Sequence, residues 1–175
     1  MKTVLCQLAE KYCCDKTPSI RHSYTPFYQR LLASKTVLRL LEIGVGAGAS
    51  MWMWREYFPW AKIYGLDNDP HHIFHEGSIH TLLCDASDSV NLRRTVEKLG
   101  GNFDLIIDDG SHYPEHQIST FHTLRPFLTA GGVYVIEDVL HFARVSNGID
   151  FPHSMHRFGG CKNPSDDTLI VFGEL

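Results

Sequence analysis

Acidic residues stand where apolar runs of this sequence end, and these acids are its main candidates for chemistry. Two of the ends carry pairs, Asp108-Asp109 and Glu137-Asp138. Carboxylates that share a site repel one another, so a bound divalent cation would relieve the conflict. Oxygen donors favour Mg²⁺, Mn²⁺ or Ca²⁺ over zinc. The alternative is that these acids cap the helices that follow, a role that suits Asp108.

A histidine accompanies the first acidic pair. His112 follows Asp109 by three residues and precedes Pro114. Free imidazole, with a pKa of about 6.5, is too weak a base to deprotonate an unactivated alcohol. A divalent ion can lower the pKa of a hydroxyl that it holds. We therefore interpret His112 as a general base that depends on a metal. The alternative is a side chain that caps a helix or orients Asp109.

A glycine-rich stretch lies between the first two apolar runs. Gly44, Gly46 and Gly48 follow the run that ends at Glu42, and Asp67 closes the next run. Strand, glycine turn, helix, strand and acid form the first unit of a nucleotide-binding parallel sheet, with the acid near the ribose hydroxyls. The same glycines satisfy the dinucleotide fingerprint. Taken alone, the stretch leaves nicotinamide cofactors and S-adenosylmethionine both open.

Five strand–helix steps would position these residues. Strands are expected at about 38–42, 61–66, 80–84, 103–107 and 133–136. Two short strands, at 155–158 and 168–172, would follow an irregular loop over 139–155. Parallel strands need crossover helices between them, and the crossovers are right-handed. The predicted fold is α/β, an open, doubly wound, Rossmann-like sheet that is mostly parallel with an antiparallel last strand.

Apolar residues at helical spacing predict the helices between the strands. Leu92, Val96 and Leu99 form one stripe that would face the sheet. The helix that begins at Pro114 is expected to reach Leu128, ahead of two glycines. Pro114 suits the first position of a helix because its fixed φ is already helical.

Length and composition limit the class of protein. The chain has 175 residues, is 43% hydrophobic and carries a net charge of −4. We expect one domain over 1–175, with an N-terminal helical segment over 1–34 ahead of a core over 35–175. The charge lacks the basic footprint of a nucleic-acid binder. No apolar run approaches the roughly 18 residues that span a membrane, so we expect a cytoplasmic protein.

These residues together carry a resemblance to a known family. With the glycine turn, Asp67, Asp85 and the run Asp108-Asp109-Gly-Ser-His112, the chain resembles class I S-adenosylmethionine-dependent methyltransferases. Within that group it is similar to the metal-dependent sugar O-methyltransferases of macrolide and related antibiotic pathways. The resemblance covers about residues 14–140, including Asp15-Lys16 and the segment around Tyr24.

The resemblance implies a role for each candidate residue. Glu42, Gly44, Gly46 and Gly48 would line the methionine part of S-adenosylmethionine, Asp67 would bind the ribose, and Asp85 and Ala86 would meet the adenine. Asn68 and Asp108 would also bind the cofactor, and the segment of Tyr24 and Thr25 would cover it. Asp109, Glu137 and Asp138 would hold Mg²⁺ or Mn²⁺, which would chelate two adjacent hydroxyls of the acceptor. His112 would be the catalytic base, next to Asp109.

The function that follows is metal-dependent O-methylation of a sugar or another small polyol-like natural product. The acceptor is expected to be a glycosylated small molecule, with no nucleic acid or membrane as partner and with self-association left open. Relatives in the antibiotic pathways carry a large extra N-terminal region, and this sequence has almost none, so the acceptor could be small or presented by a partner. Two alternatives remain, an NAD(P)-binding oxidoreductase and a non-catalytic binding protein on a methyltransferase fold.

Overall fold

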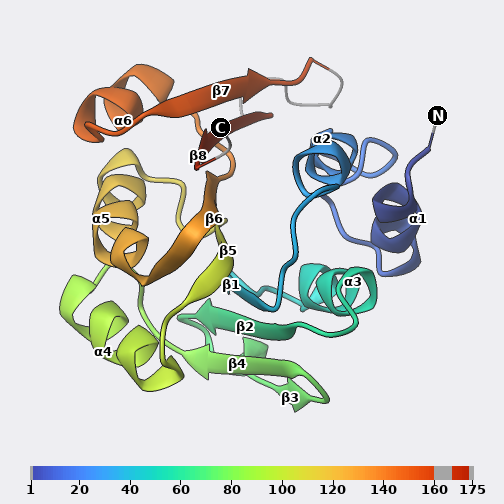
Figure 1. The fold of residues 1–175 in the computed structure, drawn as a ribbon, viewed down its shortest axis with the longest axis horizontal. Helices are drawn as coiled ribbons and strands as arrows, with labels where there is room; N and C mark the ends of the chain where they lie inside the picture. Colours follow the sequence, from blue (N-terminus) through green and yellow to red (C-terminus); the bar gives the residue numbers. More distant parts are fainter. Residues whose placement is uncertain (1, 160–166, 174–175) are drawn as a thin grey trace.

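An eight-stranded sheet forms the centre of the molecule (Figure 1). The computed structural model describes residues 2–159 and 167–173. The strands are β1 (Arg39–Ile43), β2 (Lys62–Asp67), β3 (His75–Glu76), β4 (Ile79–Leu83), β5 (Phe103–Asp108), β6 (Leu128–Ile136), β7 (His153–Arg157) and β8 (Thr168–Phe172). Their order across the sheet is β3-β4-β2-β1-β5-β6-β8-β7.

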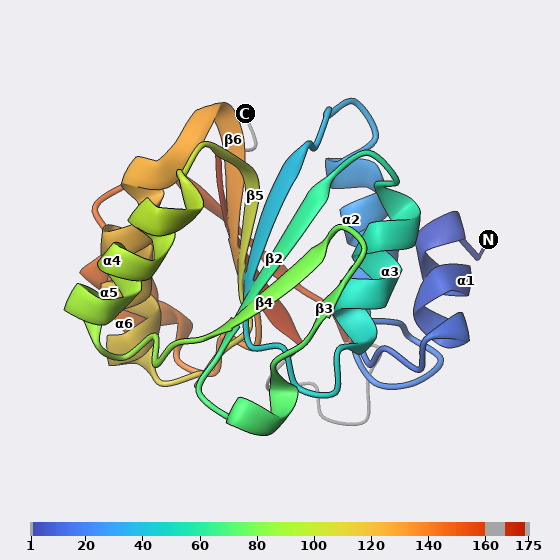
Figure 2. The same cartoon turned by 90° about the horizontal axis from the view of Figure 1, so that it is seen from below.

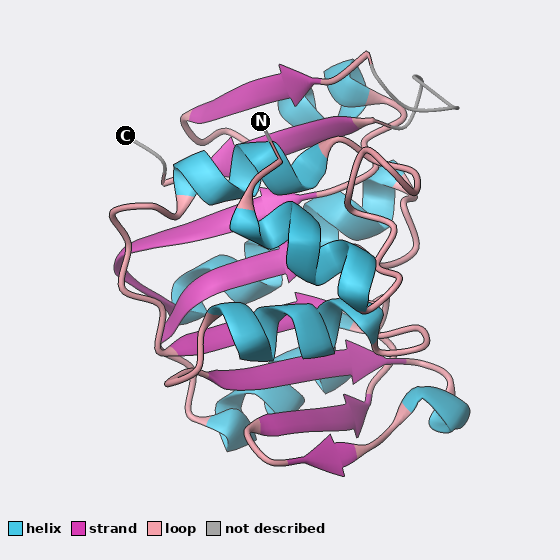
Figure 3. Ribbon diagram, turned by 90° about the vertical axis from the view of Figure 1, so that its right-hand side faces the viewer, coloured by secondary structure: helices cyan, strands magenta, loops and turns pink. Residues whose placement is uncertain are grey.

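The five central strands are parallel, and the strands at both ends are antiparallel to their neighbours. β4, β2, β1, β5 and β6 pair in parallel, whereas β8 pairs with β6 in the opposite direction. Figure 3 shows the strands side by side with helices lying over the near face. The predicted fold class, a mostly parallel Rossmann-like sheet with an antiparallel last strand, is confirmed.

Helices cover both faces of the sheet. They are α1 (Val4–Lys11), α2 (Tyr24–Leu31), α3 (Ala49–Tyr57), α4 (Ser89–Leu99), α5 (Pro114–Leu124) and α6 (Phe142–Gly148), with short 3₁₀ turns η1 (Pro70–His72) and η2 (Arg125–Phe127). Figure 2 shows α1, α2 and α3 on one face and α4, α5 and α6 on the other. Each layer encloses its own apolar core against the sheet. Among the described residues, no helix is both long enough and apolar enough to cross a membrane.

Three local predictions differ from the structure. The helix that begins at Pro114 ends at Leu124 instead of Leu128, because Pro126 cannot continue it, and β6 already begins at Leu128. The loop expected over 139–155 contains α6, whose Val145 is buried against the sheet. A two-residue strand, β3, pairs with β4 and extends the edge. The turn expected between the last two strands falls mostly at 160–166, outside the described residues.

Gly44, which follows β1, lies against the backbone of Asp109, which follows β5. Its φ is +90°, and a Cβ placed there would lie 2.1 Å from the backbone oxygen of Asp109. A left-handed conformation alone costs a non-glycine residue about 1–2 kcal/mol, and this overlap is with backbone that cannot move aside. We expect Gly44→Ala to lower the free energy of unfolding by at least about 2 kcal/mol, measured by urea titration. An unchanged midpoint would contradict this packing.

Candidate active site

The ends of three neighbouring strands bring the predicted acids together. β1 lies beside β5, and β5 beside β6. The Asp109 N–H donates to the carbonyl of Ile43 over 2.9 Å, and the Glu137 N–H donates to the carbonyl of Asp108 over 2.9 Å. These bonds continue the strand pairing past its last residues. They place both acidic pairs at one edge, as the sequence predicts.

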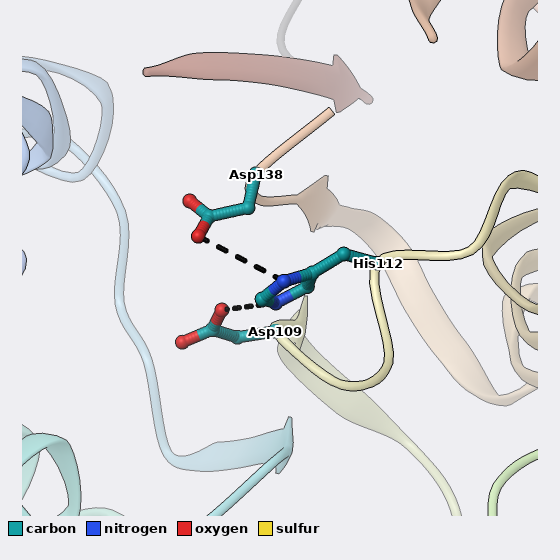
Figure 4. Close-up of side chains that lie close together, drawn as sticks. All are labelled: Asp109, His112 and Asp138. Carbon is teal, nitrogen blue, oxygen red and sulfur yellow. Dashed lines mark hydrogen bonds and ion pairs between the residues drawn. The ribbon is translucent and has the colours of Figure 1, made fainter. Parts of the chain in front are cut away.

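Asp109, His112 and Asp138 form a compact group, called here the acid–histidine group (Figure 4). Each offers one ligand atom, and these atoms lie within 4.8 Å of one another. His112 Nε2 is 3.2 Å from Asp109 Oδ1, and His112 Nδ1 is 4.0 Å from Asp138 Oδ2. The backbone of both His112 and Asp138 is left-handed, with φ of 59° and 52°. Two carboxylates beside one imidazole fit a divalent cation of the Mg²⁺ or Mn²⁺ kind.

The neighbouring carboxylates change the basicity of His112. Its partial burial alone would lower the pKa of the imidazole, but the hydrogen bond to Asp109 and the charges of Asp109 and Asp138 outweigh this, and the pKa is raised. The two acids therefore stabilise an imidazolium at this position. This is the arrangement that a base needs after it has accepted a proton.

Lys16, which belongs to the resemblance but had no predicted role, lies inside the acid cluster. Lys16 is 1% exposed. Its Nζ donates to Asp109 Oδ2 and to Glu137 Oε2, each over 2.5 Å. Burial alone would lower the pKa of Lys16, but Asp109, Glu137 and Glu42 raise it well above its usual value. Part of the repulsion that was expected to require a metal is thus relieved by an ammonium group of the chain itself.

Glu137 lies outside the acid–histidine group, although it was expected to be a metal ligand. Its Oε1 accepts a 2.5 Å hydrogen bond from the hydroxyl of Tyr28, and its Oε2 faces Lys16. The residue is 1% exposed. The difference arises because Tyr28 and Lys16 engage both carboxylate oxygens of Glu137, whereas Asp138 keeps its Oδ2 near His112.

Tyr24 and Thr25 pack beneath the acids instead of lining the space above them. Both are fully buried. The hydroxyl of Tyr24 donates to Asp138 Oδ1 over 2.6 Å, and that of Thr25 lies 3.2 Å from the sulfur of Cys6. Neither lines the two cavities described below. The expectation that these two side chains cover a cofactor therefore differs from their placement on the sheet face.

Two cavities open at this edge of the sheet and share Gly44, Asp67 and Gly110. The first, of about 340 Å³, is lined among others by Asn68, Asp85, Ala86 and Asp108. The second, of about 520 Å³, is lined among others by Gly46, Lys16, Asp109, His112 and Asp138. Most of the predicted cofactor residues thus line the first cavity, and the acid–histidine group lines the second.

Other predicted cofactor residues lie behind this surface. Glu42 is fully buried and lines neither cavity; its Oε2 accepts a 2.7 Å hydrogen bond from Trp54. Gly48 precedes α3 with φ of +85°, where a Cβ would meet the ring of Phe74. His116 and Thr120 also line the first cavity and were not predicted, since α5 carried no recognised motif. Ser111 lines it too; it lies within the recognised run that ends at His112 but had no predicted role.

Asp67 holds the glycine turn in place. Its Oδ2 accepts hydrogen bonds from Val45 N and Gly46 N over 2.8 and 3.0 Å, and its Oδ1 accepts one from Asp69 N over 2.9 Å. Burial would raise the pKa of Asp67, but these backbone N–H groups outweigh it, and the pKa is lowered. The ionised carboxylate predicted to meet a ribose therefore also shapes the turn beside it.

Asp108 provides a test of the electrostatics of the first cavity. Burial raises the pKa of Asp108 to about 7 from the ordinary 3.8, against the Gly110 N–H that lowers it. The folded chain keeps this proton to higher pH than the unfolded chain, so the group costs stability as pH rises from about 4 to about 7. We expect Asp108→Asn to be more stable than wild type, with its advantage growing by about 2–3 kcal/mol between pH 5 and pH 8. Urea unfolding at both pH values measures this, and an advantage independent of pH would contradict it.

The sequence of this chain matches a protein family and several known enzymes. Residues 41–139 match a protein family described as a methyltransferase domain. The chain belongs to this family. It is 42% identical over 142 residues to 8-demethyl-8-(2-methoxy-alpha-L-rhamnosyl)-tetracenomycin-C 3'-O-methyltransferase of Streptomyces olivaceus, a match that covers 76% of this chain and 36% of that protein. It is 37% identical to demethylmacrocin O-methyltransferase of Streptomyces fradiae, covering 98% of this chain and 42% of that protein.

Solved structures show the same relationship. The MycE methyltransferase from the mycinamycin biosynthetic pathway, in complex with Mg and SAH, superposes with a TM-score of 0.73 at 37% identity, over 82% of this chain and 39% of MycE. The resemblance to antibiotic sugar O-methyltransferases that the sequence indicates is confirmed. The chain spans less than half the length of these relatives.

Proposed function

We propose that this methyltransferase domain transfers a methyl group from S-adenosylmethionine to a hydroxyl of a sugar carried by a small natural product, with the help of a divalent metal. The observation that carries the proposal is the second cavity, which places the acid–histidine group beside the glycine turn. The names of the relatives support the sugar acceptor, and MycE has been crystallised with Mg, SAH and mycinamycin VI.

The two cavities suggest where S-adenosylmethionine, the metal and the acceptor would each bind. Asp67 and Asn68 would bind the ribose, and Asp85 and Ala86 the adenine, in the first cavity. Gly44 and Gly46 would let the methionine part pass close to the backbone. Asp109 and Asp138 would hold Mg²⁺, while Glu137, assigned with them from the sequence, is engaged by Lys16 and Tyr28. When bound, S-adenosylmethionine supplies an electrophilic methyl group. When bound, Mg²⁺ supplies a Lewis acid that draws adjacent hydroxyls of the acceptor together and makes them more acidic.

Residues of the chain would accept the proton of the acceptor hydroxyl and hold the reacting groups in orientation. His112 accepts the proton of the acceptor hydroxyl on a ring nitrogen, while the new O–C bond forms and the S–C bond of the donor breaks. Asp109, 3.2 Å from Nε2, holds the ring and stabilises the imidazolium. Tyr24 holds Asp138 from below. Fixing two reactants in this geometry is the main contribution that a protein makes to such a displacement.

The remaining parts of the proposal concern the setting of the enzyme. We propose that the protein is cytoplasmic and that residues 1–175 form one methyltransferase domain, with an N-terminal helical segment over 1–34 ahead of the core over 35–175. The acceptor is a glycosylated small molecule, with no nucleic acid or membrane as partner. Relatives such as mycinamicin VI 2''-O-methyltransferase of Micromonospora griseorubida support this class of acceptor.

Calorimetry and a turnover assay test the proposal together. The chain should bind S-adenosylmethionine and SAH but not NAD(P), and with Mg²⁺ it should release SAH in the presence of glycosylated macrolide or tetracenomycin acceptors. Tight binding of a nicotinamide cofactor alone would favour the oxidoreductase. Binding of SAH with no turnover on a broad acceptor panel, metal present, would favour a non-catalytic binding protein.

A further inference from the structure

A buried histidine and a buried aspartate lie behind Asp138, and neither takes part in the proposed chemistry. His22 is 2% exposed and Asp167 is fully buried. His22 Nε2 lies 3.6 Å from Asp138 Oδ2, and His22 Nδ1 lies 3.7 Å from Asp167 Oδ1. Three residues from distant parts of the chain thus form a row of carboxylate, imidazole and carboxylate, and Asp138, at one end of it, lines the second cavity. We call His22 and Asp167 the buried pair.

Neighbouring residues hold the buried pair in place. The ring of His22 stacks on that of Tyr24, with centroids 4.8 Å apart and an angle of 12° between the planes. Asp167 Oδ1 accepts a 3.0 Å hydrogen bond from Ser23 N, just before α2. Asp167 itself directly precedes β8. The ends of α2 and β8 therefore fix the imidazole where it faces Asp138.

Packing alone does not explain why polar atoms are kept at this place. Within residues 2–159 and 167–173, His22 Nδ1 and Asp167 Oδ2 are buried and have no hydrogen-bond partner. A buried polar group without a partner destabilises a folded protein, and apolar residues of similar shape would avoid that cost. The buried pair therefore costs stability, and we look for its benefit at the residue that it faces, Asp138.

The orientation of Asp138 needs support from its surroundings. Its backbone is left-handed, with φ of 52°, a conformation that residues with a Cβ rarely adopt. Its Oδ1 accepts a 2.6 Å hydrogen bond from the hydroxyl of Tyr24. Its Oδ2 lies 3.6 Å from His22 and 4.0 Å from His112, and Figure 4 shows this oxygen directed toward His112. His22 thus reaches, from the buried side, the oxygen that Tyr24 does not bind.

We propose that the buried pair orients Asp138 as a metal ligand: Asp167 holds His22, and His22 keeps Asp138 Oδ2 directed at the acid–histidine group. The inference rests on the metal dependence in the proposed function. It makes His22 and Asp167 positioning residues, because neither lines the two cavities. The contact of 3.6 Å is longer than a hydrogen bond, and such contacts in active sites often shorten when ligands bind.

Mn²⁺ binding to His22→Phe tests this without any acceptor. Phenylalanine keeps a ring that can stack on Tyr24 and removes both nitrogens. Free Mn²⁺ is measured by electron paramagnetic resonance, and SAH affinity by calorimetry. We expect Mn²⁺ affinity to fall at least about tenfold, as for other partners of metal ligands, and SAH affinity to stay close to that of wild type. Mn²⁺ affinity equal to that of wild type would overturn the inference.

Two control variants separate positioning from folding. Glutamine carries an amide nitrogen that can reach the place of Nε2, so His22→Gln should recover most of the Mn²⁺ affinity. Leu31 belongs to the apolar core beneath the same helix, α2. Leu31→Ala should therefore lower the midpoint of urea unfolding and leave Mn²⁺ affinity unchanged. No recovery in His22→Gln, or an equal loss of Mn²⁺ affinity in Leu31→Ala, would assign His22 to packing and overturn the inference.

Asp167→Asn keeps the test decisive if His22→Phe does not fold. Asparagine keeps the shape of the side chain and an oxygen for Ser23 N. The single variant should bind Mn²⁺ severalfold more weakly, and it should add no further loss to His22→Phe, because Asp167 acts through His22. Unchanged affinity in the single variant, or equal losses in both backgrounds, would overturn the inference.

The same titrations distinguish failure of the inference from failure of the proposed function. Wild-type protein that binds no Mn²⁺ would refute the metal in the proposed function and this inference with it. Mn²⁺ binding that does not change when the buried pair is altered would refute this inference alone.

Discussion

Asp109→Asn is expected to reduce methyl transfer at saturating Mg²⁺ by about 1,000-fold, beyond the roughly 10–100-fold that loss of an outer partner of a metal ligand costs. Asp109 contacts both cationic partners in the site: its Oδ2 accepts a hydrogen bond from Lys16, and its Oδ1 faces His112. An amide keeps the shape of the side chain but lacks the charge that a divalent ion requires. SAH affinity, measured by calorimetry, should stay close to that of wild type, because Asp109 does not line the first cavity.

A matched control separates the loss of a metal ligand from the loss of charge near the cavity. Asp15 also lines the second cavity but lies outside the acid–histidine group. Asp15→Asn should therefore retain most of the activity and its dependence on Mg²⁺. Activity of Asp109→Asn near the wild-type rate, or equal losses in the two variants, would contradict the role of Asp109.

His112→Asn is expected to lower the turnover rate by about 100-fold or more, the usual contribution of a positioned general base. Asparagine is preferred to alanine because the backbone at His112 has φ of 59°, and asparagine tolerates the left-handed region better than other residues with a Cβ. The loss should appear in kcat, since His112 acts on the proton and not on cofactor binding. Steady-state kinetics with varied acceptor measure it.

The control for this variant is His141→Asn, which changes an exposed histidine at the start of α6. It should leave kcat close to wild type. A near-native kcat for His112→Asn would reassign the imidazole to orienting Asp109. A fall in SAH affinity for the same variant would assign it to the cofactor site instead.

The fold and the edge that carries the site could be predicted from the sequence because both depend on local patterns. Each central strand is a short apolar run that stops at an acid or a turn, and neighbouring parallel strands end at the same edge, so the sequence predicts that the acids after β5 and β6 lie together. Gly44 and Asp67 were likewise readable from their spacing. The patterns did not predict short elements such as α6 and β3, because so few residues show no clear periodicity.

The contacts across the acid cluster could not be predicted in this way. Lys16 is separated from Asp109 by 93 residues and from Glu137 by 121, and nothing in its neighbourhood marks it as buried. The same holds for Tyr28, which engages Glu137 over 109 residues. The sequence indicated crowded negative charge correctly. It did not indicate that a lysine and two tyrosines from the N-terminal segment would satisfy part of that charge.

The most direct test of the proposed chemistry is a crystal of the protein grown with SAH and Mn²⁺, measured at the manganese absorption edge. We expect one anomalous peak in the second cavity, coordinated by Asp109 and Asp138 and close to His112, with SAH along the glycine turn and at least one coordination position open to the cavity. A peak among Glu42, Glu137 and Lys16, or no peak at this edge of the sheet while SAH is bound, would contradict it.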